Sequence, residues 1–233
     1  MLDIDKRERQ LDEARHYVRE QLGQDSSGHD WWHIVRVTNT AKRLAAEEQA
    51  DGFVCELAAL LHDVADEKLN DSAEAGLDKV RTWMTGQQIE PVVLEHVMEI
   101  IGTISFKGGN QPPVTTKEAQ VVQDADRLDA LGAIGIARTF AYAGWKGHAI
   151  YDPELPYREQ LTPESYRSGA TSAVNHFYEK LLLLKGRMNT RSGKALAESR
   201  HRVMEAYLKQ FYAEWEGTDG DWAVPSDTAG APL

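Results

Sequence analysis

Residues 62–63 read His-Asp and directly follow an apolar stretch, residues 53–61, in which Glu56 is the one charged side chain. An unbroken apolar run is typical of a buried helix, where an imidazole and a carboxylate without partners are unfavourable. A divalent cation would give both groups a partner, because neutral histidine nitrogens and carboxylate oxygens are ordinary metal ligands. The alternative is a His-Asp pair that caps the helix or bonds to a neighbouring helix.

Two residues elsewhere in the chain could complete a metal site. His33 lies near the start of an expected helix that begins at about residue 30, and Asp126 lies within a later expected helix. With His62 and Asp63 they provide two nitrogen and two oxygen ligands. Such a set leaves positions open for water and substrate, as a catalytic metal site requires.

The elements that must position these residues are predicted to be helices, because apolar side chains recur at intervals of three and four residues. The expected helices cover residues 5–22, 30–49, 53–61, 72–85, 91–102, 116–143, 162–185 and 192–216. Glycine and proline mark two connecting segments, 106–113 and 144–161. No alternating pattern predicts a pair of strands. The sequence therefore predicts an all-α protein with one domain.

Composition and charge narrow the class of function. The chain has 42% hydrophobic and 27% charged residues, no apolar leader at its start and a single cysteine, Cys55. We therefore expect a cytoplasmic protein with no membrane partner. The net charge of −11 argues against a nucleic-acid polymer as partner. It leaves a small phosphorylated substrate open, because a metal ion and a few cations can reverse the field inside one cleft.

In these residues the chain resembles the HD-domain metal-dependent phosphohydrolases, in particular their small stand-alone bacterial members, whose motif is H…HD…D on helices. The motif is matched in order by His33, the pair at 62–63 and Asp126. The short sequences around them also match, namely His-Asp-Val-Ala-Asp-Glu at 62–67 and Ala-Asp-Arg-Leu at 125–128. The resemblance covers about residues 25–145. It implies an HD helical bundle in which 146–216 is a helical extension of the same domain. The residue pattern adds an N-terminal helix at 1–24 that packs on this domain and a flexible tail at 217–233.

The resemblance also implies roles for individual residues. The ligands of one divalent transition metal ion, Mn²⁺ with Fe²⁺, Co²⁺, Ni²⁺ and Zn²⁺ as alternatives, would be His33, His62, Asp63 and Asp126. Asp66 lies one helical turn beyond the pair, where an acidic residue assists the attacking water in relatives that cleave nucleotide phosphates. Asp66 is therefore the candidate general base or acid, and Glu67 is its substitute.

A phosphate substrate needs cationic donors besides the metal. The candidates are Lys107 in a glycine-rich loop, Arg127 next to the last expected metal ligand, and Arg36, three residues beyond the first. Each could equally be a surface or salt-bridged side chain.

Other residues near the motifs admit two interpretations. Asp129 shares a helix face with Asp126 and could accept a hydrogen bond from a ligand imidazole, or it could be a solvated acid, as we expect for Asp124. Residues 188–194 could form a phosphate anchor at a helix N-terminus or a loop with a cap. The expected core aromatics, one of which could stack on a base, are Trp31, Trp32 and Trp145.

We therefore expect a metal-dependent phosphohydrolase that acts on a small phosphorylated substrate, a nucleotide, as a nucleoside triphosphate pyrophosphohydrolase or a nucleotidase. One alternative is a non-catalytic nucleotide-binding regulatory module that keeps the fold and the metal. Another is an HD-fold iron oxygenase. Dinuclear HD proteins have two additional histidines between the His-Asp pair and the last aspartate, and this chain has only His96 there. The oligomeric state stays open.

Overall fold

The computed structural model describes residues 2–23, 30–66, 69–104, 113–158 and 170–220. The regular elements in these ranges are all helical, which confirms the predicted all-α class. The first half contains α1 (Leu2–Leu22), α2 (Trp31–Glu48), α3 (Gly52–Leu61), the 3-10 turn η1 (His62–Ala65), α4 (Ala73–Gly86) and α5 (Pro91–Ile104). The second half contains α6 (Lys117–Asp129), α7 (Gly132–Lys146), α9 (Ala173–His176), the π-helical turn η2 (Phe177–Leu181), α10 (Leu182–Leu184), the 3-10 turn η3 (Lys185–Arg187) and α11 (Arg191–Trp215).

Local chemistry explains where several helices begin. Asp30 accepts a hydrogen bond from the His33 backbone nitrogen at 2.8 Å, and Thr116 accepts one from the backbone nitrogen of Ala119 at 3.2 Å. Each cap satisfies a donor that the first helical turn leaves without a partner. Pro91 opens α5, where its missing N–H is harmless. The predicted helix starts at these three places are confirmed.

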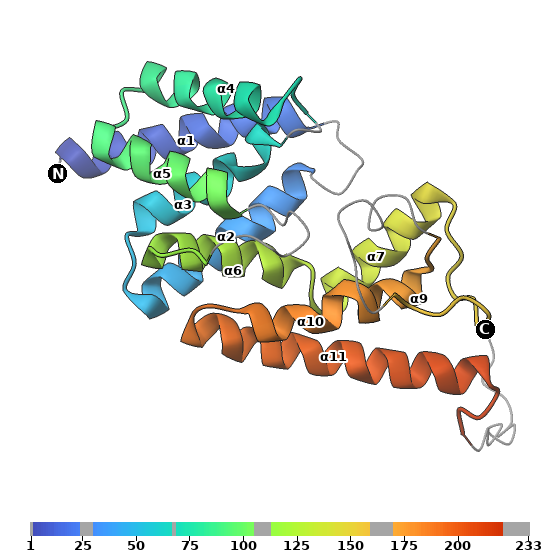
Figure 1. Cartoon of the computed structure of the whole chain (residues 1–233). Coiled ribbons are helices and arrows are strands. Elements are labelled where there is room, and N and C mark those ends of the chain that lie inside the picture. Colours follow the sequence, from blue (N-terminus) through green and yellow to red (C-terminus); the bar gives the residue numbers. More distant parts are fainter. Residues whose placement is uncertain (1, 24–29, 67–68, 105–112, 159–169, 221–233) are drawn as a thin grey trace, which may run out of the picture.

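Helix α2 lies at the centre of the bundle, packed between α3 and α6 (Figure 1). Its inward face buries Ile34, Val37, Ala41 and Leu44. Helix α3 packs on α1 and α5, and every side chain from Val54 to Leu61 is buried. Full burial of an aliphatic side chain stabilises the fold by about 1.5–3 kcal/mol, so these two helices form a rigid base. That base carries both histidines of the predicted metal site.

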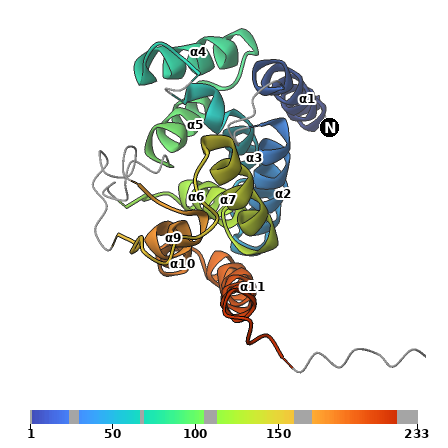
Figure 2. The ribbon, with the colours of Figure 1, turned by 90° about the vertical axis from the view of Figure 1, so that its right-hand side faces the viewer.

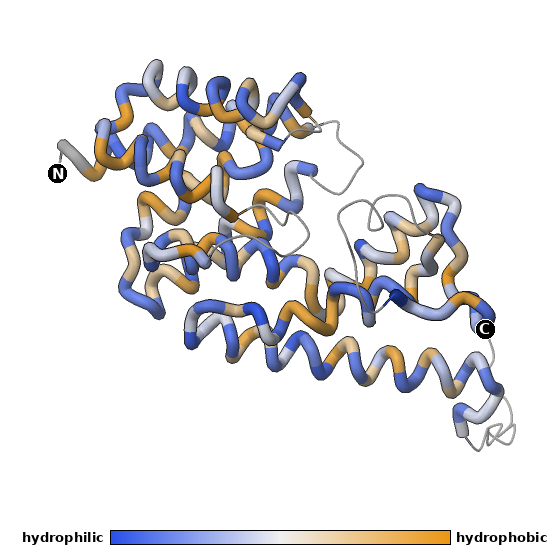
Figure 3. The backbone as a smooth tube through the Cα atoms, in the orientation of Figure 1, coloured by the Kyte–Doolittle hydropathy of each residue, from blue (hydrophilic) through white to orange (hydrophobic). Residues whose placement is uncertain are grey.

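The C-terminal helices lie on the opposite side of this base from α1 and α4 (Figure 2). Hydrophobic and hydrophilic residues alternate along α11, as expected of a helix with one buried face (Figure 3). Ala197, Met204 and Leu208 on that face belong to the same core cluster as residues of α1, α2 and α3. The exact boundaries of the predicted N-terminal helix, core, extension and tail stay predictions. In the described ranges, no helix is both long and apolar enough to cross a membrane.

The single long helix predicted over 116–143 is wrong. The chain breaks between α6 and α7, where Leu131 is extended and Gly132 takes a φ of +70°. A Cβ on Gly132 would lie 3.1 Å from the Cβ and Cγ atoms of Arg200, so both conformation and space favour glycine. The turn directs α7 back across the end of α6, which places its side chains over the predicted site.

The helix predicted over 162–185 is also wrong as one element. Ser172 has extended backbone angles and caps a helix that begins only at Ala173, through a hydrogen bond from the backbone nitrogen of Asn175 at 3.1 Å. The predicted cap at Thr162 lies outside the described residues. Beyond Ala173 the chain is helical through α9, η2, α10 and η3.

Gly76 allows α4 to pack closely against η1, the turn that carries the His-Asp pair. A Cβ at this position would lie 2.4 Å from the carbonyl oxygen of Ala65 and 2.9 Å from Nδ2 of Asn70. That amide in turn donates to the carbonyl oxygens of Val64 at 2.9 Å and Asp66 at 2.8 Å. The close approach therefore supports the shape of the turn itself.

We expect Gly76→Ala to lower the free energy of unfolding, measured by urea denaturation, by about 1–3 kcal/mol because the added methyl must displace backbone. Alanine normally stabilises a helix interior by about 1 kcal/mol relative to glycine, so the sign of the effect is diagnostic. Gly86→Ala, at the end of the same helix with no atom within 4 Å of the added Cβ, is the matched control. Equal stabilisation by both substitutions would contradict the close contact.

Candidate metal centre

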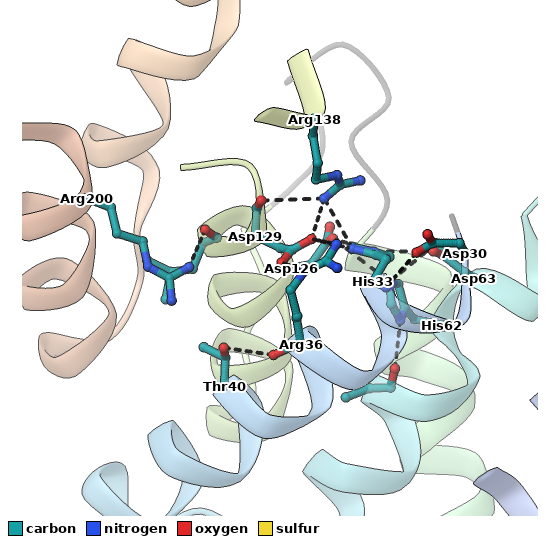
Figure 4. A network of polar contacts seen from close by, with 12 residues as sticks. Asp30, His33, Arg36, Thr40, His62, Asp63, Asp126, Asp129, Arg138 and Arg200 are labelled. Carbon is teal, nitrogen blue, oxygen red and sulfur yellow. Dashed lines mark hydrogen bonds and ion pairs between the residues drawn. The ribbon is translucent and has the colours of Figure 1, made fainter. Parts of the chain in front are cut away.

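Two imidazoles face the same small space, His33 from the first turn of α2 and His62 from η1 (Figure 4). Nδ1 of His33 lies 2.7 Å from Oδ2 of Asp129, and Nδ1 of His62 lies 2.8 Å from the carbonyl oxygen of Ala59. A carboxylate and a carbonyl only accept hydrogen bonds, so each Nδ1 carries the ring proton. Both Nε2 atoms therefore direct a lone pair into the shared space.

Two carboxylates approach these lone pairs. The Oδ2 and Oδ1 atoms of Asp63 lie 3.4 Å from Nε2 of His33 and 3.3 Å from Nε2 of His62. Oδ1 of Asp126 lies 3.5 Å and 3.9 Å from the same two nitrogens. Ligand atoms of His33, His62 and Asp63 all lie within 4.8 Å of one another, so this cluster could hold a metal ion.

The nitrogen that faces the centre of the cluster tests whether a metal ion fits. Nε2 of His62 is buried, and within the part of the chain that the structure describes it makes no hydrogen bond. A buried imidazole nitrogen without a partner is unfavourable, and a cation bound to its lone pair removes that penalty. The donor set of two imidazoles and two carboxylates suits a divalent transition metal. The residues present therefore fit such an ion.

Three of the four side chains of the cluster are buried, and the fourth, Asp126, is partly exposed. The side chains of His33, His62 and Asp63 are 2%, 5% and 8% exposed, whereas that of Asp126 is 32% exposed. Asp126 is therefore the member of the cluster that solvent reaches most directly.

Asp129 orients His33 and is itself bound by two arginines. Arg36 donates from Nε to Oδ1 at 2.7 Å and from Nη2 to Oδ2 at 3.0 Å, and Nη1 of Arg138 also donates to Oδ2. Burial by itself raises the pKa of the Asp129 carboxyl, but the hydrogen bonds from His33 and Arg36 and the charge of Arg138 hold that pKa well below its usual range. Asp129 therefore stays an ionised acceptor for the His33 ring proton.

The sequence did not single out Arg138. It lies on α7, and it reaches Asp129 only because the chain turns back at Gly132 (Figure 4). Arg138 lies nine residues after Asp129, on a different helix, so helical spacing in the sequence does not predict their contact. The glycines at 132 and 135 were the one available hint of a break.

Comparison with known proteins agrees with this arrangement. The family model of the HD domain matches residues 31–131. The protein YpgQ of Bacillus subtilis (strain 168) is 37% identical over 215 residues, which cover 91% of this chain and 97% of YpgQ. The chain belongs to the HD-domain superfamily. The predicted resemblance is confirmed, and the HD fold supports metal-dependent phosphohydrolase chemistry in general.

Solved structures extend the likeness beyond the matched HD domain. An HD-superfamily hydrolase from Bacillus thuringiensis superposes with a TM-score of 0.73 at 46% identity, covering 90% of this chain and 98% of the other. The crystal structure of Bacillus subtilis YpgQ in complex with ADP gives a TM-score of 0.72 at 38% identity, covering 90% and 100%. The C-terminal helices are thus shared with other HD proteins.

Asp66, the first of the two predicted acid–base residues, is placed differently from expectation. Helix α3 ends at Leu61, and Asp66 follows the 3-10 turn with extended backbone angles of φ −61° and ψ 134°. The premise that Asp66 continues the helix face of the His-Asp pair is therefore wrong, although it lies three residues from Asp63. Glu67 and the predicted phosphate ligand Lys107 lie outside the described residues. The catalytic roles stay predictions.

The other predicted substrate ligands have protein partners. The guanidinium of Arg127 donates to the carbonyl oxygen of Arg187, and that of Arg36 is bound to Asp129 as described. Burial lowers the pKa of Arg127, against a smaller opposing effect of the nearby Asp124 charge. These contacts favour positioning roles over substrate binding for both arginines.

The expectation that Asp124 is a solvated acid is wrong. Asp124 is fully buried and points away from the metal cluster, toward the N-terminus of α11. Its carboxylate accepts hydrogen bonds from the backbone nitrogens of Asn189 and Thr190, both at 2.8 Å. Of the two interpretations of residues 188–194, the capped loop therefore holds, because an internal carboxylate fills the place that a phosphate would take.

The expected surroundings of the three tryptophans, and those of His96, can also be compared with the structure. Trp31 packs against the core, but Trp32 and Trp145 are 63% and 57% exposed, so the expectation of three core aromatics is wrong for two of them. Nε2 of His96 lies 3.1 Å from Oγ1 of Thr116 and 3.8 Å from Oε2 of Glu118, both at the N-terminal end of α6. Among the described residues, the group of potential ligands at His33, His62 and Asp63 contains no additional histidine.

Proposed function

We propose that this HD protein hydrolyses a phosphoester or phosphoanhydride bond of a small nucleotide, using one divalent transition metal ion. The observation that carries the proposal is the convergence of both Nε2 atoms with the carboxylates of Asp63 and Asp126 on one space. His33, His62, Asp63 and Asp126 would hold the ion, with Mn²⁺ as the first candidate. The chemistry that such an ion would supply is a bound water of pKa about 7 and a polarised phosphoryl oxygen.

The residues of this chain have the following proposed tasks. By the resemblance to relatives that cleave nucleotide phosphates, Asp66 would accept a proton from the water as the water oxygen bonds to phosphorus and the bond from phosphorus to the leaving oxygen breaks. The protonated Asp66, or solvent, returns a proton to the leaving oxygen. Arg138 and Arg36 keep Asp129 ionised, and Asp129 holds the His33 ring with Nε2 toward the cluster.

The nucleotide part of the proposal rests on relatives. The structure of YpgQ, 38% identical to this chain, contains ADP. The protein is acidic overall, so its cluster would attract a nucleoside phosphate only with a cation present. The bond that is cut, a triphosphate α–β bond or a monophosphate ester, distinguishes a pyrophosphohydrolase from a nucleotidase.

A release assay over nucleoside tri-, di- and monophosphates with added Mn²⁺ tests the proposal, with phosphate and pyrophosphate measured separately. We expect turnover that depends on metal, because the ligand set fits one ion. Pyrophosphate release from triphosphates would identify a pyrophosphohydrolase, and phosphate release from monophosphates a nucleotidase. If the metal-loaded protein turns over no nucleotide or simple phosphoester, the hydrolase proposal fails. Tight ADP binding without turnover would instead favour the regulatory module.

A further inference from the structure

The last turns of α6, which carry Asp126, receive hydrogen bonds from residues 187–200, the segment that leads into α11 and forms its first turns. The fully buried carboxylate of Asp124 accepts hydrogen bonds from Oγ1 of Thr190 at 2.7 Å and from Nδ2 of Asn189 at 2.9 Å. The backbone nitrogens of both residues donate to it as well. This carboxylate therefore has four donors from one short stretch of chain.

The contact between Asp124 and the first turn of α11 leaves no room for a side chain at position 193. A Cβ on Gly193 would lie 2.3 Å from Oδ2 of Asp124 and 2.7 Å from Oγ1 of Thr190. The carboxylate thus lies directly against the first turn of α11, whose exposed N–H groups and dipole favour a negative charge. Helix α6 is held to α11 at a fixed distance two residues before Asp126.

Further contacts hold the turn on the other side of Asp126. Arg127 donates to the carbonyl oxygen of Arg187. Arg200 of α11, labelled in Figure 4, donates to the carbonyl oxygen of Leu128. The Leu128 carbonyl lies in the last turn of α6, where it also accepts a hydrogen bond from the backbone nitrogen of Leu131 at 3.1 Å and where a positive charge is favourable. Segment 187–200 therefore contacts the residues before and after Asp126.

The same segment also touches the helix that carries His33. The backbone nitrogen of Ser192 donates to Oε1 of Glu48, the last residue of α2, at 2.8 Å. The hydrogen bonds of Ser192 lower the pKa of the Glu48 carboxyl, so this contact is with an ionised group. Segment 187–200 thus contacts both α6, which carries Asp126, and the C-terminal end of α2, the helix whose first turn carries His33.

Among the described residues, the contacts recorded for the Asp126 side chain are the two with the imidazoles. It is the most exposed of the four cluster residues, and its contacts with His33 and His62, at 3.5 Å and 3.9 Å, are longer than hydrogen bonds. Its direction toward the cluster therefore depends on the backbone of α6.

We infer that segment 187–200 of the C-terminal extension positions Asp126 as the fourth ligand of the metal centre. The extension is then part of the metal site, through the hydrogen bonds to Asp124, Arg127 and Leu128. This inference rests on the metal site proposed above. Its test measures Mn²⁺ affinity of the folded protein and does not require turnover.

Titration of Mn²⁺ into the full-length metal-free protein, followed by calorimetry, provides the test. Arg200→Met keeps the length of the side chain but removes the donor to the Leu128 carbonyl, and Thr190→Val removes the hydroxyl that bonds Asp124. We expect each to weaken Mn²⁺ binding by about 10-fold, the lower end of the effect of losing an outer partner of a metal site. Each is also made in an Asp126→Asn background, where we expect it to change Mn²⁺ affinity less than 2-fold, because the residue that it positions is already lost.

Leu208→Ala is the matched control, because it removes buried apolar contacts from α11 but has no hydrogen-bonding group to offer α6. It is expected to lower the melting temperature and leave Mn²⁺ affinity unchanged. Unchanged affinity in both Arg200→Met and Thr190→Val would overturn the inference, as would an equal loss with and without Asp126. If Asp126→Asn alone binds Mn²⁺ as tightly as the natural protein, the proposed ligand set fails, and the inference fails with it.

Discussion

Asp63→Asn is expected to abolish metal binding and hydrolysis while the protein stays folded. The substitution keeps the shape of a buried side chain but removes the charge that faces Nε2 of both His33 and His62 at 3.3–3.4 Å. We expect Mn²⁺ affinity to fall by more than the roughly 10–100-fold that accompanies loss of an outer partner. Calorimetric titration and phosphate release measure the two effects.

Thermal unfolding gives an independent measure of the same loss. Mn²⁺ at 100 times its dissociation constant should raise the free energy of unfolding of the natural protein by about 2.7 kcal/mol, and this gain should be absent in Asp63→Asn. Asp78→Asn, an exposed acid on α4, is the control and should behave as the natural protein. Full activity in Asp63→Asn would reject the site assignment even if the protein proved to be a phosphohydrolase.

Asp129→Asn is expected to combine a loss of stability with a loss of metal affinity. The variant leaves Arg36 and Arg138 beside a neutral amide, whose single oxygen cannot accept hydrogen bonds from both arginines and from the His33 ring at once. Removing one partner of a buried ion pair costs about 3–5 kcal/mol, and we expect the lower end because both arginines are about one third exposed. Mn²⁺ affinity should fall by roughly 10–100-fold as His33 loses its orientation.

Glu179→Gln separates the two effects. Glu179 is also a buried carboxylate bound by an arginine, with Arg158 Nε at 2.8 Å and Nη2 at 2.7 Å, but it lies in the π-helical turn η2. It should lower stability to a similar degree, measured by urea denaturation, and leave Mn²⁺ affinity as in the natural protein. An equal fall of metal affinity in both variants would mean that Asp129 acts through general stability and not through His33.

The chemistry of the site was readable from the sequence because it depends on residue type and short-range pattern. The His-Asp pair follows an apolar run, and the run predicted a buried helix that ends at the pair, as α3 and η1 do. Helix starts at Asp30, Pro91 and Thr116 were predictable for the same reason, since a cap involves atoms only two or three residues apart. The all-α class follows from the periodicity of such helices.

The tertiary structure alone decided what surrounds the four candidate ligands. Arg36 and Asp129 are 93 residues apart, and Asp124 and Thr190 are 66 apart, so no local pattern relates them. Asp124 and Asp129 have the same side chain and lie five residues apart, yet one meets the N-terminus of α11 and the other meets His33. A carboxylate in a helix gives no sign of its partner in the sequence, because the partner is set by the packing of whole helices. The sequence determined which groups could bind a metal, and the packing of α2, α6, α7 and α11 decided which of them face it.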